Sequence, residues 1–269
     1  MSTVSLANGI SIGYEEQGDG YPVVLLPGSA VDHQIFTPGG QFSALSENFR
    51  VVALDWRGTG ESDRPGNEYW APDLADDVIG VLDALNIDKA HIVGMSQGAT
   101  IAIRLAAEHP ERVNRLVLYS PWDHSDNFLA RQFRIWQHLY ATADPLEYGK
   151  ATLWWLLSPE FINGHPDMVD GIAEASFAGE AAASRHAQVR SAHINELHDA
   201  RDQLPDIKAL TLVIAGEDDR TIPVAYSRRT AEAIAGAKIE VLTGPGASHA
   251  HFLERGEEVT KHTVNFLLP

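Results

Sequence analysis

The fold is decided by the stretch His91-Ile-Val-Gly-Met-Ser-Gln-Gly-Ala-Thr-Ile-Ala-Ile-Arg-Leu-Ala-Ala107. It joins a short apolar run, His91–Val93, to a segment with helical spacing of apolar residues, Ala99–Ala107, through Gly94-Met-Ser96-Gln-Gly98. A sharp turn from a strand into a helix strains its middle residue, and small residues two positions away on either side avoid clashes with the backbone. The stretch therefore predicts a strand, a tight turn that lifts the Ser96 hydroxyl out of the sheet edge, and a helix.

Apolar runs rich in β-branched residues recur along the chain, each bounded by Gly, Pro, Asp or Ser. Helical spacing separates several of them, as in Leu74–Leu85. Strands that alternate with helices indicate βαβ units and an α/β fold with a mostly parallel sheet covered on both faces. The predicted strands are Val23–Leu26, Val51–Leu54, His91–Val93, Leu116–Leu118, Leu210–Ala215 and Ile239–Leu242.

The alternation stops between about Pro121 and Pro205, where aromatic residues are frequent and no convincing strand pattern occurs. This composition predicts a helical subdomain at 121–205 that divides the core into 1–120 and 206–269. The aromatic side chains have two interpretations. They either line a substrate pocket or simply build the core of small helices, which need large side chains.

A serine nucleophile needs a base, usually a histidine oriented by a carboxylate. The strand 210–215 leads into a loop with Asp218 and Asp219, and the strand 239–242 leads into a loop with His249 and His251. Taken alone, the aspartates are typical of a turn or helix N-cap, and His249 is typical of a surface loop. Following Ser96 in the order Ser, Asp, His at strand ends, they favour a catalytic set.

On these residues the chain resembles the α/β-hydrolase family over nearly all of 20–120 and 205–269. Four motifs carry the resemblance: the turn around Ser96, an oxyanion loop at Leu25-Leu-Pro-Gly-Ser29, the segment Asp55-Trp-Arg-Gly-Thr-Gly-Glu-Ser62, and Gly216-x-x-Asp219-x-x-x-Pro223 followed by His249 and Glu254. The resemblance implies an eight-stranded, mostly parallel sheet flanked by helices. It also implies that 121–205 is a helical cap inserted after the sixth strand.

The resemblance places the catalytic acid on Asp219 rather than Asp218 and the base on His249 rather than His251. It gives the oxyanion-hole N–H groups to Ser29 and Gln97. Pro27 replaces a common histidine, and Ser248 replaces a common glycine. Because the oxyanion donors are backbone N–H groups, neither replacement removes a required function.

Ser96 also narrows the set of candidate reactions, since haloalkane dehalogenases and epoxide hydrolases of this fold carry Asp at that position. Carbon–carbon bond hydrolases often have Asn where this chain has Met95, and perhydrolases often have Pro where it has Ala30. The remaining resemblance is to small carboxylesterases and 3-oxoadipate enol-lactonase-like enzymes. It implies a serine hydrolase that cleaves a carboxylic ester or lactone through an acyl-enzyme. A slow-turnover small-molecule receptor, a carbon–carbon bond hydrolase and a perhydrolase stay open as alternatives.

The expected substrate is small and largely apolar. The candidate pocket residues are Trp122, Phe133, Trp136 and Trp154. An inward-facing cap arginine would instead favour a substrate carboxylate, bound through paired hydrogen bonds; the alternative for such residues is a solvated helix face. The arginines in question are Arg131, Arg134, Arg185 and Arg190.

The composition excludes several other classes. The chain has 269 residues, with 37 acidic residues against 20 Lys and Arg and a formal net charge of −17, so it lacks the basic surface that nucleic acids or anionic membranes require. It has no cysteine and no metal-binding spacing such as H-E-x-x-H, so no metal or cofactor is expected. Without a basic, apolar leader or a long apolar segment, a cytoplasmic location is expected, and the oligomeric state stays unknown.

Overall fold

The computed structural model describes residues 2–179 and 182–269. Its centre is an eight-stranded sheet in the order β1-β2-β4-β3-β5-β6-β7-β8. β1 and β2 pair antiparallel, as do β2 and β4, and the other neighbouring pairs are parallel. The predicted α/β class with a mostly parallel sheet is confirmed. The strands are β1 Ser2–Ser5, β2 Ser11–Gln17, β3 Pro22–Leu26, β4 Arg50–Leu54, β5 Ala90–Met95, β6 Val113–Tyr119, β7 Leu210–Gly216 and β8 Lys238–Leu242.

Successive side chains of the buried strands point to opposite faces of the sheet, and this alternation separates two cores. In β3, Val23 and Leu25 belong to one apolar cluster, whereas Val24 and Leu26 belong to the other. Both faces are covered, so the strands are apolar throughout rather than alternating, which made them recognisable as short continuous runs.

Helices α2, α3 and α9 pack on one face of the sheet, and α1 and α11 pack on the other. Short 3₁₀ helices, η1 and η3, follow β3 and precede β7. The bounds are η1 His33–Phe36, α1 Gln41–Ser46, α2 Ala71–Ala84, α3 Gln97–Glu108, η3 Leu204–Asp206, α9 Val224–Ala233, α10 His251–Glu254 and α11 Gly256–Leu267.

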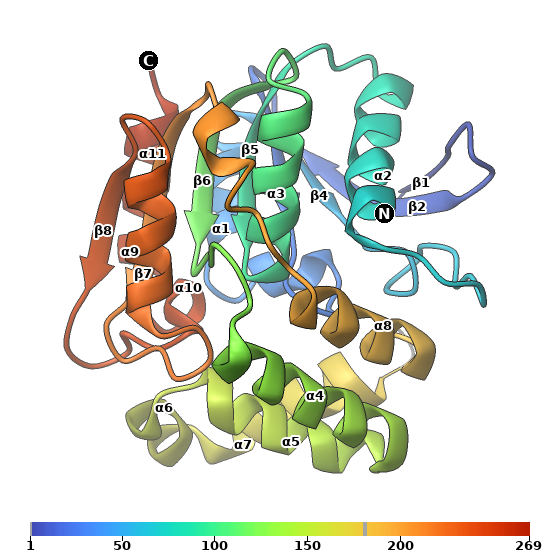
Figure 1. Cartoon of the computed structure of the whole chain (residues 1–269), viewed down its shortest axis with the longest axis vertical. Helices are drawn as coiled ribbons and strands as arrows, with labels where there is room; N and C mark the ends of the chain where they lie inside the picture. The colour runs from blue at the N-terminus through green and yellow to red at the C-terminus, as the bar shows by residue number, and fades with distance from the viewer. Residues whose placement is uncertain (1, 180–181) are drawn as a thin grey trace.

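A second group of helices lies between β6 and β7 in the chain. Figure 1 shows α4 to α7 together beyond the end of the sheet to which the arrowheads of β6 and β8 point, with α8 beside them. The carboxyl ends of the parallel strands therefore face these helices. Their bounds are α4 Asn127–Thr142, α5 Pro145–Leu156, α6 Pro159–Gly164, α7 Pro166–Ala173, the π-helical turn η2 Glu174–Ala178 and α8 Arg185–Glu196. We refer to these helices as the cap helices.

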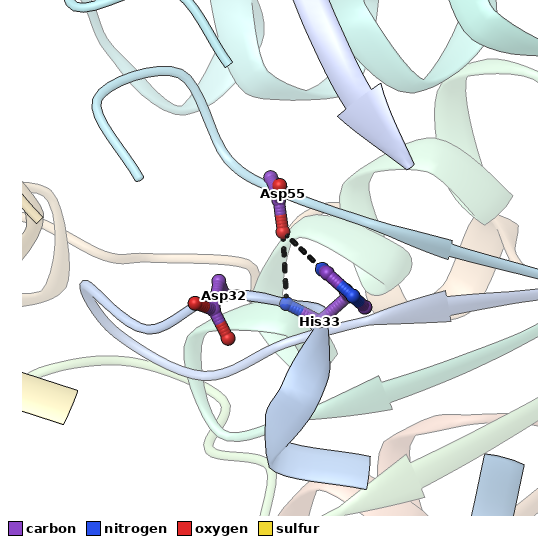
Figure 2. A group of neighbouring side chains, drawn as sticks. All are labelled: Asp32, His33 and Asp55. Atoms are coloured by element: carbon purple, nitrogen blue, oxygen red, sulfur yellow. Dashed lines mark hydrogen bonds and ion pairs between the residues drawn. The ribbon is translucent and has the colours of Figure 1, made fainter. Parts of the chain in front are cut away.

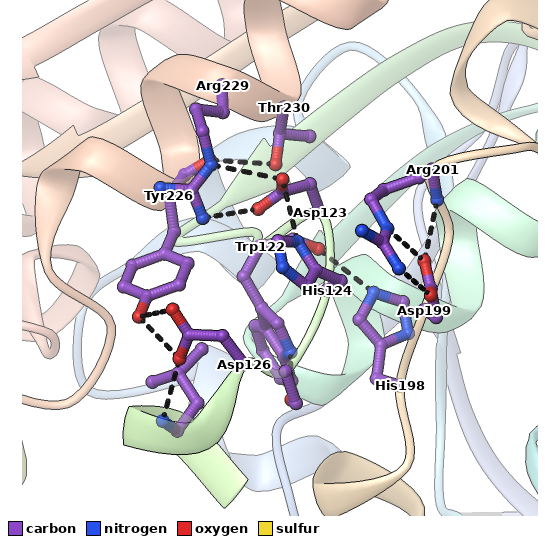
Figure 3. A network of polar contacts seen from close by, with 12 residues as sticks. Trp122, Asp123, His124, Asp126, His198, Asp199, Arg201, Tyr226, Arg229 and Thr230 are labelled. Atoms are coloured by element: carbon purple, nitrogen blue, oxygen red, sulfur yellow. Dashed lines mark hydrogen bonds and ion pairs between the residues drawn. The ribbon is translucent and has the colours of Figure 1, made fainter.

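Polar contacts fasten the chain where it leaves the sheet for the cap helices (Figure 3). Arg229 of α9 donates to both carboxylate oxygens of Asp123, at 3.1 and 2.9 Å. Tyr226 donates to Asp126, whose carboxylate in turn accepts the N–H of Phe128 at the start of α4. The entry to α4 is thus bonded to α9 of the core, which limits how this end of the cap helices can move.

In the part of the chain that the structure describes, no helix combines the length and the apolar character that crossing a bilayer requires.

Candidate active site

Ser96 occupies the turn between β5 and α3 with φ 52° and ψ −116°, a conformation that non-glycine residues rarely adopt. A Cβ on Gly94 would lie 2.4 Å from the carbonyl oxygen of Gly98, and one on Gly98 would lie 2.1 Å from that of Leu26. Both positions therefore require glycine. The side chain of Ser96 is 8% exposed, so the hydroxyl sits at a nearly enclosed surface.

His249 and Asp219 lie beside Ser96 in one chain of contacts. The Nε2 atom of His249 is 3.0 Å from Ser96 Oγ, and its Nδ1 atom is 2.7 Å from Asp219 Oδ2. Both residues are buried, whereas Asp218 is exposed. The three residues come from the ends of β5, β7 and β8, where parallel strands bring their following loops to one edge of the sheet. This geometry allows Ser96 to pass its proton to a histidine that a carboxylate holds in one tautomer.

Four groups bond to the carboxylate of Asp219: the ring of His249, described above, and three further hydrogen-bond donors. Its Oδ1 atom accepts the N–H groups of Thr221 and Ile222, at 2.8 and 2.7 Å, and its Oδ2 atom accepts the hydroxyl of Ser120 at 2.9 Å. Ser120 Oγ also lies 3.3 Å from Nε2 of His251. Burial lowers the pKa of His251 to about 3, so this ring is neutral at pH 7. The side chain of Ser120, which contacts Asp219, and that of His251, which contacts Ser120, are therefore both uncharged.

Ser29 and Gln97 lie on two elements, the loop after β3 and the first residue of α3. The next loop residue, Ala30, has φ 54°, so this loop also holds a non-glycine residue in the left-handed region. The side chains of Ser29 and Gln97 both contact the cap helix α8, through Ser191 and Asn195.

A cavity of about 610 Å³ lies between the sheet edge and the cap helices. Met95 and Ala250, the chain neighbours of Ser96 and His249, both line it. Most of its other walls are aliphatic. Among the described residues that line it, Asp32 is the charged one, and Lys, Arg and His are absent. The larger apolar lining side chains are Ile35, Leu153, Leu156, Leu157, Met168, Ile172, Phe177, Phe252 and Leu253.

The aromatic residues expected to form the pocket lie elsewhere. Trp122, Phe133 and Trp136 are at most 3% exposed and belong to the same apolar cluster as the sheet residues. Trp154 is 56% exposed, and the guanidinium of Arg220 stacks 4.6 Å from its ring centre. None of the four is among the described residues that line the cavity. The pocket assignment is therefore corrected: three of these rings build the core that joins cap helices to sheet, and the cavity is lined by mostly aliphatic side chains together with two phenylalanines.

The four cap arginines do not enter the cavity either, as far as the described residues define it. Arg131 and Arg134 are exposed, and Arg134 pairs with Glu196 at 2.6 Å. Arg185 donates to the carbonyl oxygen of Ala143 at 3.0 Å, and Arg190 is paired with Glu68. The substrate carboxylate that an inward arginine would bind therefore finds no such partner here.

Asp32, His33 and Asp55 place potential metal-ligand atoms within 4.8 Å of one another (Figure 2). The atoms of Asp55 are already used, because Oδ1 accepts the N–H of His33 at 3.0 Å and Oδ2 accepts that of Glu61 at 3.0 Å. Burial alone would lower the pKa of His33, but its hydrogen bond to Asp55 and the nearby acidic charges outweigh burial and raise it. The cluster thus stabilises the loop after β3.

Comparison with known proteins shows the family of this chain. The family model of the alpha/beta hydrolase fold matches residues 21–255, so the chain belongs to the alpha/beta hydrolase family. A protein from Azorhizobium caulinodans that bears the name "Putative carbamate hydrolase RutD" is 31% identical over 84% of this chain and 84% of its own length. The 2-hydroxymuconate semialdehyde hydrolase of Pseudomonas putida is 32% identical over 97% of this chain and 92% of its own.

Among solved structures, the enol-lactonase from Burkholderia xenovorans LB400 superposes with a TM-score of 0.87 at 27% identity, covering 99% of each chain. The predicted family resemblance is therefore confirmed. These relatives are named as hydrolases, and they therefore support hydrolysis as the reaction class of this chain. Their names differ in the bond or substrate, so they do not agree on one substrate.

Four side chains near the predicted set were not found from the sequence. Ser120 follows β6 and carried the same signal as the others, a polar residue at the carboxyl end of a parallel strand. His251 was considered only as a rival to His249. Ser191 and Asn195 lie four residues apart on α8, a spacing that also occurs on any solvated helix face. Without the fold, nothing in the sequence brings that helix next to Ser29.

Proposed function

We propose that this chain is a serine hydrolase that cleaves the carboxylic ester or lactone of a small, neutral, largely apolar substrate, with residues 121–205 as the cap over its site. The contact chain from Ser96 Oγ through His249 to Asp219, at 3.0 and 2.7 Å, carries the proposal. Ser96, His249 and Asp219 take the roles of nucleophile, base and acid, and the N–H groups of Ser29 and Gln97 form the oxyanion hole.

The reaction has two halves. Ser96 Oγ attacks the carbonyl carbon while its proton passes to His249 Nε2, and the carbonyl oxygen becomes an oxyanion that the two N–H groups stabilise. The bond to the leaving alkoxide breaks as His249 returns the proton to it, which leaves an acyl group on Ser96. His249 then takes a proton from a water molecule as the water oxygen attacks the acyl carbon. It returns that proton to Ser96 Oγ as the acyl–Oγ bond breaks, which releases the carboxylic acid and restores the free serine. The carboxylate of Asp219 orients the imidazole and stabilises its charged form in both halves.

The cavity supports a neutral substrate. Its apolar walls favour an acyl or alcohol part with little charge, because a buried ion without a partner is costly. Among the described lining residues Asp32 is the one acidic side chain, and burial raises the pKa of its carboxyl. An anionic substrate would therefore meet a carboxylate and no counter-ion, in a chain whose formal net charge is −17.

Carbon–carbon bond hydrolysis is a second candidate, favoured by the relative named 2-hydroxymuconate semialdehyde hydrolase, which covers 97% of this chain. The same nucleophile and base would serve it. Met95 stands where Asn is frequent in such enzymes, and this position lines the cavity. Ester or lactone hydrolysis is therefore the favoured reaction.

The test is steady-state hydrolysis of p-nitrophenyl butyrate by the wild-type chain and by Ser96→Ala. Loss of the nucleophile should lower kcat by about 10⁵-fold or more. Ser43→Ala is the matched control, since Ser43 is an exposed serine of α1 whose hydroxyl donates to the main-chain oxygen of Gly40. A mono-p-nitrophenyl ester of glutaric acid, which carries a negative charge on the acyl part, should be hydrolysed at least about tenfold more slowly than the butyrate.

Two results would refute the proposal. Wild-type turnover by Ser96→Ala would remove the nucleophile from the mechanism. A wild-type chain that acylates once and then stops would support the receptor alternative, because an enzyme must deacylate in repeated cycles.

A further inference from the structure

Four side chains near the turn that carries Ser96, three of them buried and that of Ser29 half-buried, form a closed ring of hydrogen bonds. Gln97 Nε2 donates to Asn195 Oδ1 at 2.9 Å, and Asn195 Nδ2 donates to Ser29 Oγ at 3.1 Å. Ser29 Oγ lies 2.8 Å from Ser191 Oγ, which donates to Gln97 Oε1 at 2.6 Å. We call these four residues the polar ring.

The direction of every bond in the polar ring is fixed. Ser191 has one hydroxyl proton and gives it to Gln97, so the proton between Ser191 and Ser29 must come from Ser29. Each of the two amides then donates once and accepts once within the ring. The remaining amide proton of Gln97 goes to the main-chain oxygen of Ser191 at 3.0 Å. A ring in which all donors point the same way round allows each bond to polarise the next.

The polar ring links two parts of the molecule that lie far apart in the sequence. Ser29 and Gln97 belong to the sheet core, and they carry the two N–H groups that the proposed function assigns to the oxyanion. Ser191 and Asn195 belong to the cap helix α8, one turn apart, so both side chains reach the same spot. Gln97, Ser191 and Asn195 are at most 6% exposed, which makes an unmade bond in the ring costly.

We infer that Ser191 and Asn195 are positioning residues for the oxyanion hole, so that helix α8 of the cap completes the catalytic site. An oxyanion donor is effective only when its N–H points at the position that the developing charge will occupy. Ser29 lies on a loop whose next residue, Ala30, has φ 54°, and such a loop relaxes unless its surroundings hold it. The polar ring supplies that restraint, and it also fixes the side chain of Gln97 at the first turn of α3.

The inference rests on the proposed function, and its test compares Ser191→Ala, Asn195→Leu and Ser191→Thr. Ser191→Ala opens the ring while leaving helix α8 with a good helix former. We expect it to lower kcat for p-nitrophenyl butyrate by about ten- to a hundredfold, less than the loss of a whole oxyanion donor, with KM changed by less than about threefold. Asn195→Leu should cost at least as much, because it also removes two ring bonds and in addition places an apolar side chain against the amide of Gln97 and the hydroxyl of Ser29. Ser191→Thr keeps the hydroxyl and should recover most of the activity.

A second readout separates positioning from mere folding. An alkyl boronic acid forms a tetrahedral adduct with the serine whose oxygen occupies the oxyanion hole, so its inhibition constant should weaken in proportion to the loss in kcat/KM. Glu196→Gln is the control, since Glu196 of the same helix bonds Arg134 and Gln137 on α4 and stands outside the ring. It should leave kcat and boronate binding within about twofold of wild type.

Unchanged kcat in a folded Ser191→Ala variant overturns the inference, and so does a loss in kcat that boronate affinity does not follow. If Asn195→Leu does not fold, Ser191→Ala with its threonine counterpart decides alone. Failure of the proposed function is a different result: the wild-type chain would then hydrolyse none of the esters, whereas here the wild type is active and only the ring variants are in question.

Discussion

Two polar networks meet at Ser96, and they differ in where they come from. On the acid–base side, His249, Asp219, Ser120 and His251 follow strands β6, β7 and β8 of the sheet core. On the oxyanion side, the polar ring takes Ser29 and Gln97 from the core and Ser191 and Asn195 from cap helix α8. One network is internal to the core, and the other spans two regions.

This difference separates what the sheet can do alone from what it needs the cap helices to do. A parallel sheet fixes the ends of its strands, so the acid–base side keeps its geometry as long as the core is folded. The oxyanion side depends on a helix some 95 residues away in the chain from Gln97, so any displacement of α8 reaches it. A change in the cap should therefore alter stabilisation of the transition state before it alters proton transfer.

The largest expected effect tests whether the acid–base side depends on the core carboxylate. Asp219→Asn should lower kcat for p-nitrophenyl butyrate by about 10⁴-fold, because an amide facing Nδ1 favours the wrong imidazole tautomer. Asp218→Asn, the matched control, should stay within about twofold of wild type, since Asp218 is exposed and Asp219 is buried against His249. Steady-state kinetics of the two variants also decides between adjacent aspartates that the sequence left open. A large loss in the Asp218 variant would reverse the assignment.

The sequence was most informative where chemistry and backbone geometry coincide. Gly94 and Gly98 are required by contacts of 2.4 and 2.1 Å that a Cβ would make, so the turn around Ser96 was visible as a spacing of glycines. The buried strands β3 to β7 were visible as apolar runs, and the more exposed edge strand β8 was visible through its apolar residues Ile239, Val241 and Leu242. By contrast, β1 and β2 have more exposed, mixed-polarity sequences and were implied only by the family resemblance.

The sequence was least informative about the side chains that the cap helices contribute. An aromatic residue on a helix satisfies a core as well as a pocket, and only packing decides between them. Trp122, Phe133 and Trp136 lie in the core. The cavity is lined mostly by non-aromatic apolar residues such as Leu153 and Met168. The ring partner Asn195 was equally undetermined, because its role depends on how α8 lies against the loop after β3.

An intermediate effect tests whether the two networks act independently. Ser120→Ala removes one hydrogen bond to the Asp219 carboxylate and should lower kcat by about tenfold, as expected for a bond to a charged group. Because Ser120 and Ser191 share no hydrogen-bond partner, their effects on log kcat should add, with a coupling below about 0.5 kcal/mol in the double variant. A double-mutant cycle measures this coupling. A coupling above about 1 kcal/mol would mean that the two sides form one network, and the comparison would fail.

The smallest expected effect is a pH dependence of stability. It belongs to the acid–base side, because that side contains the buried titratable side chain of His251, whereas the polar ring contains no titratable group. Burial lowers the pKa of His251 to about 3, and the charge of Asp219 only partly offsets this. Between about pH 6.5 and 3 the unfolded chain binds a proton at this residue and the folded chain does not, so stability falls as pH falls, by at most about 1.4 kcal/mol per pH unit. Urea unfolding at pH 7, 6 and 5 should show this slope reduced in His251→Gln and unchanged in His138→Gln, a variant at an exposed position of α4. Equal slopes in wild type and His251→Gln would show that His251 is charged or solvated in the folded protein. The buried, neutral histidine that distinguishes the acid–base side from the oxyanion side would then be absent.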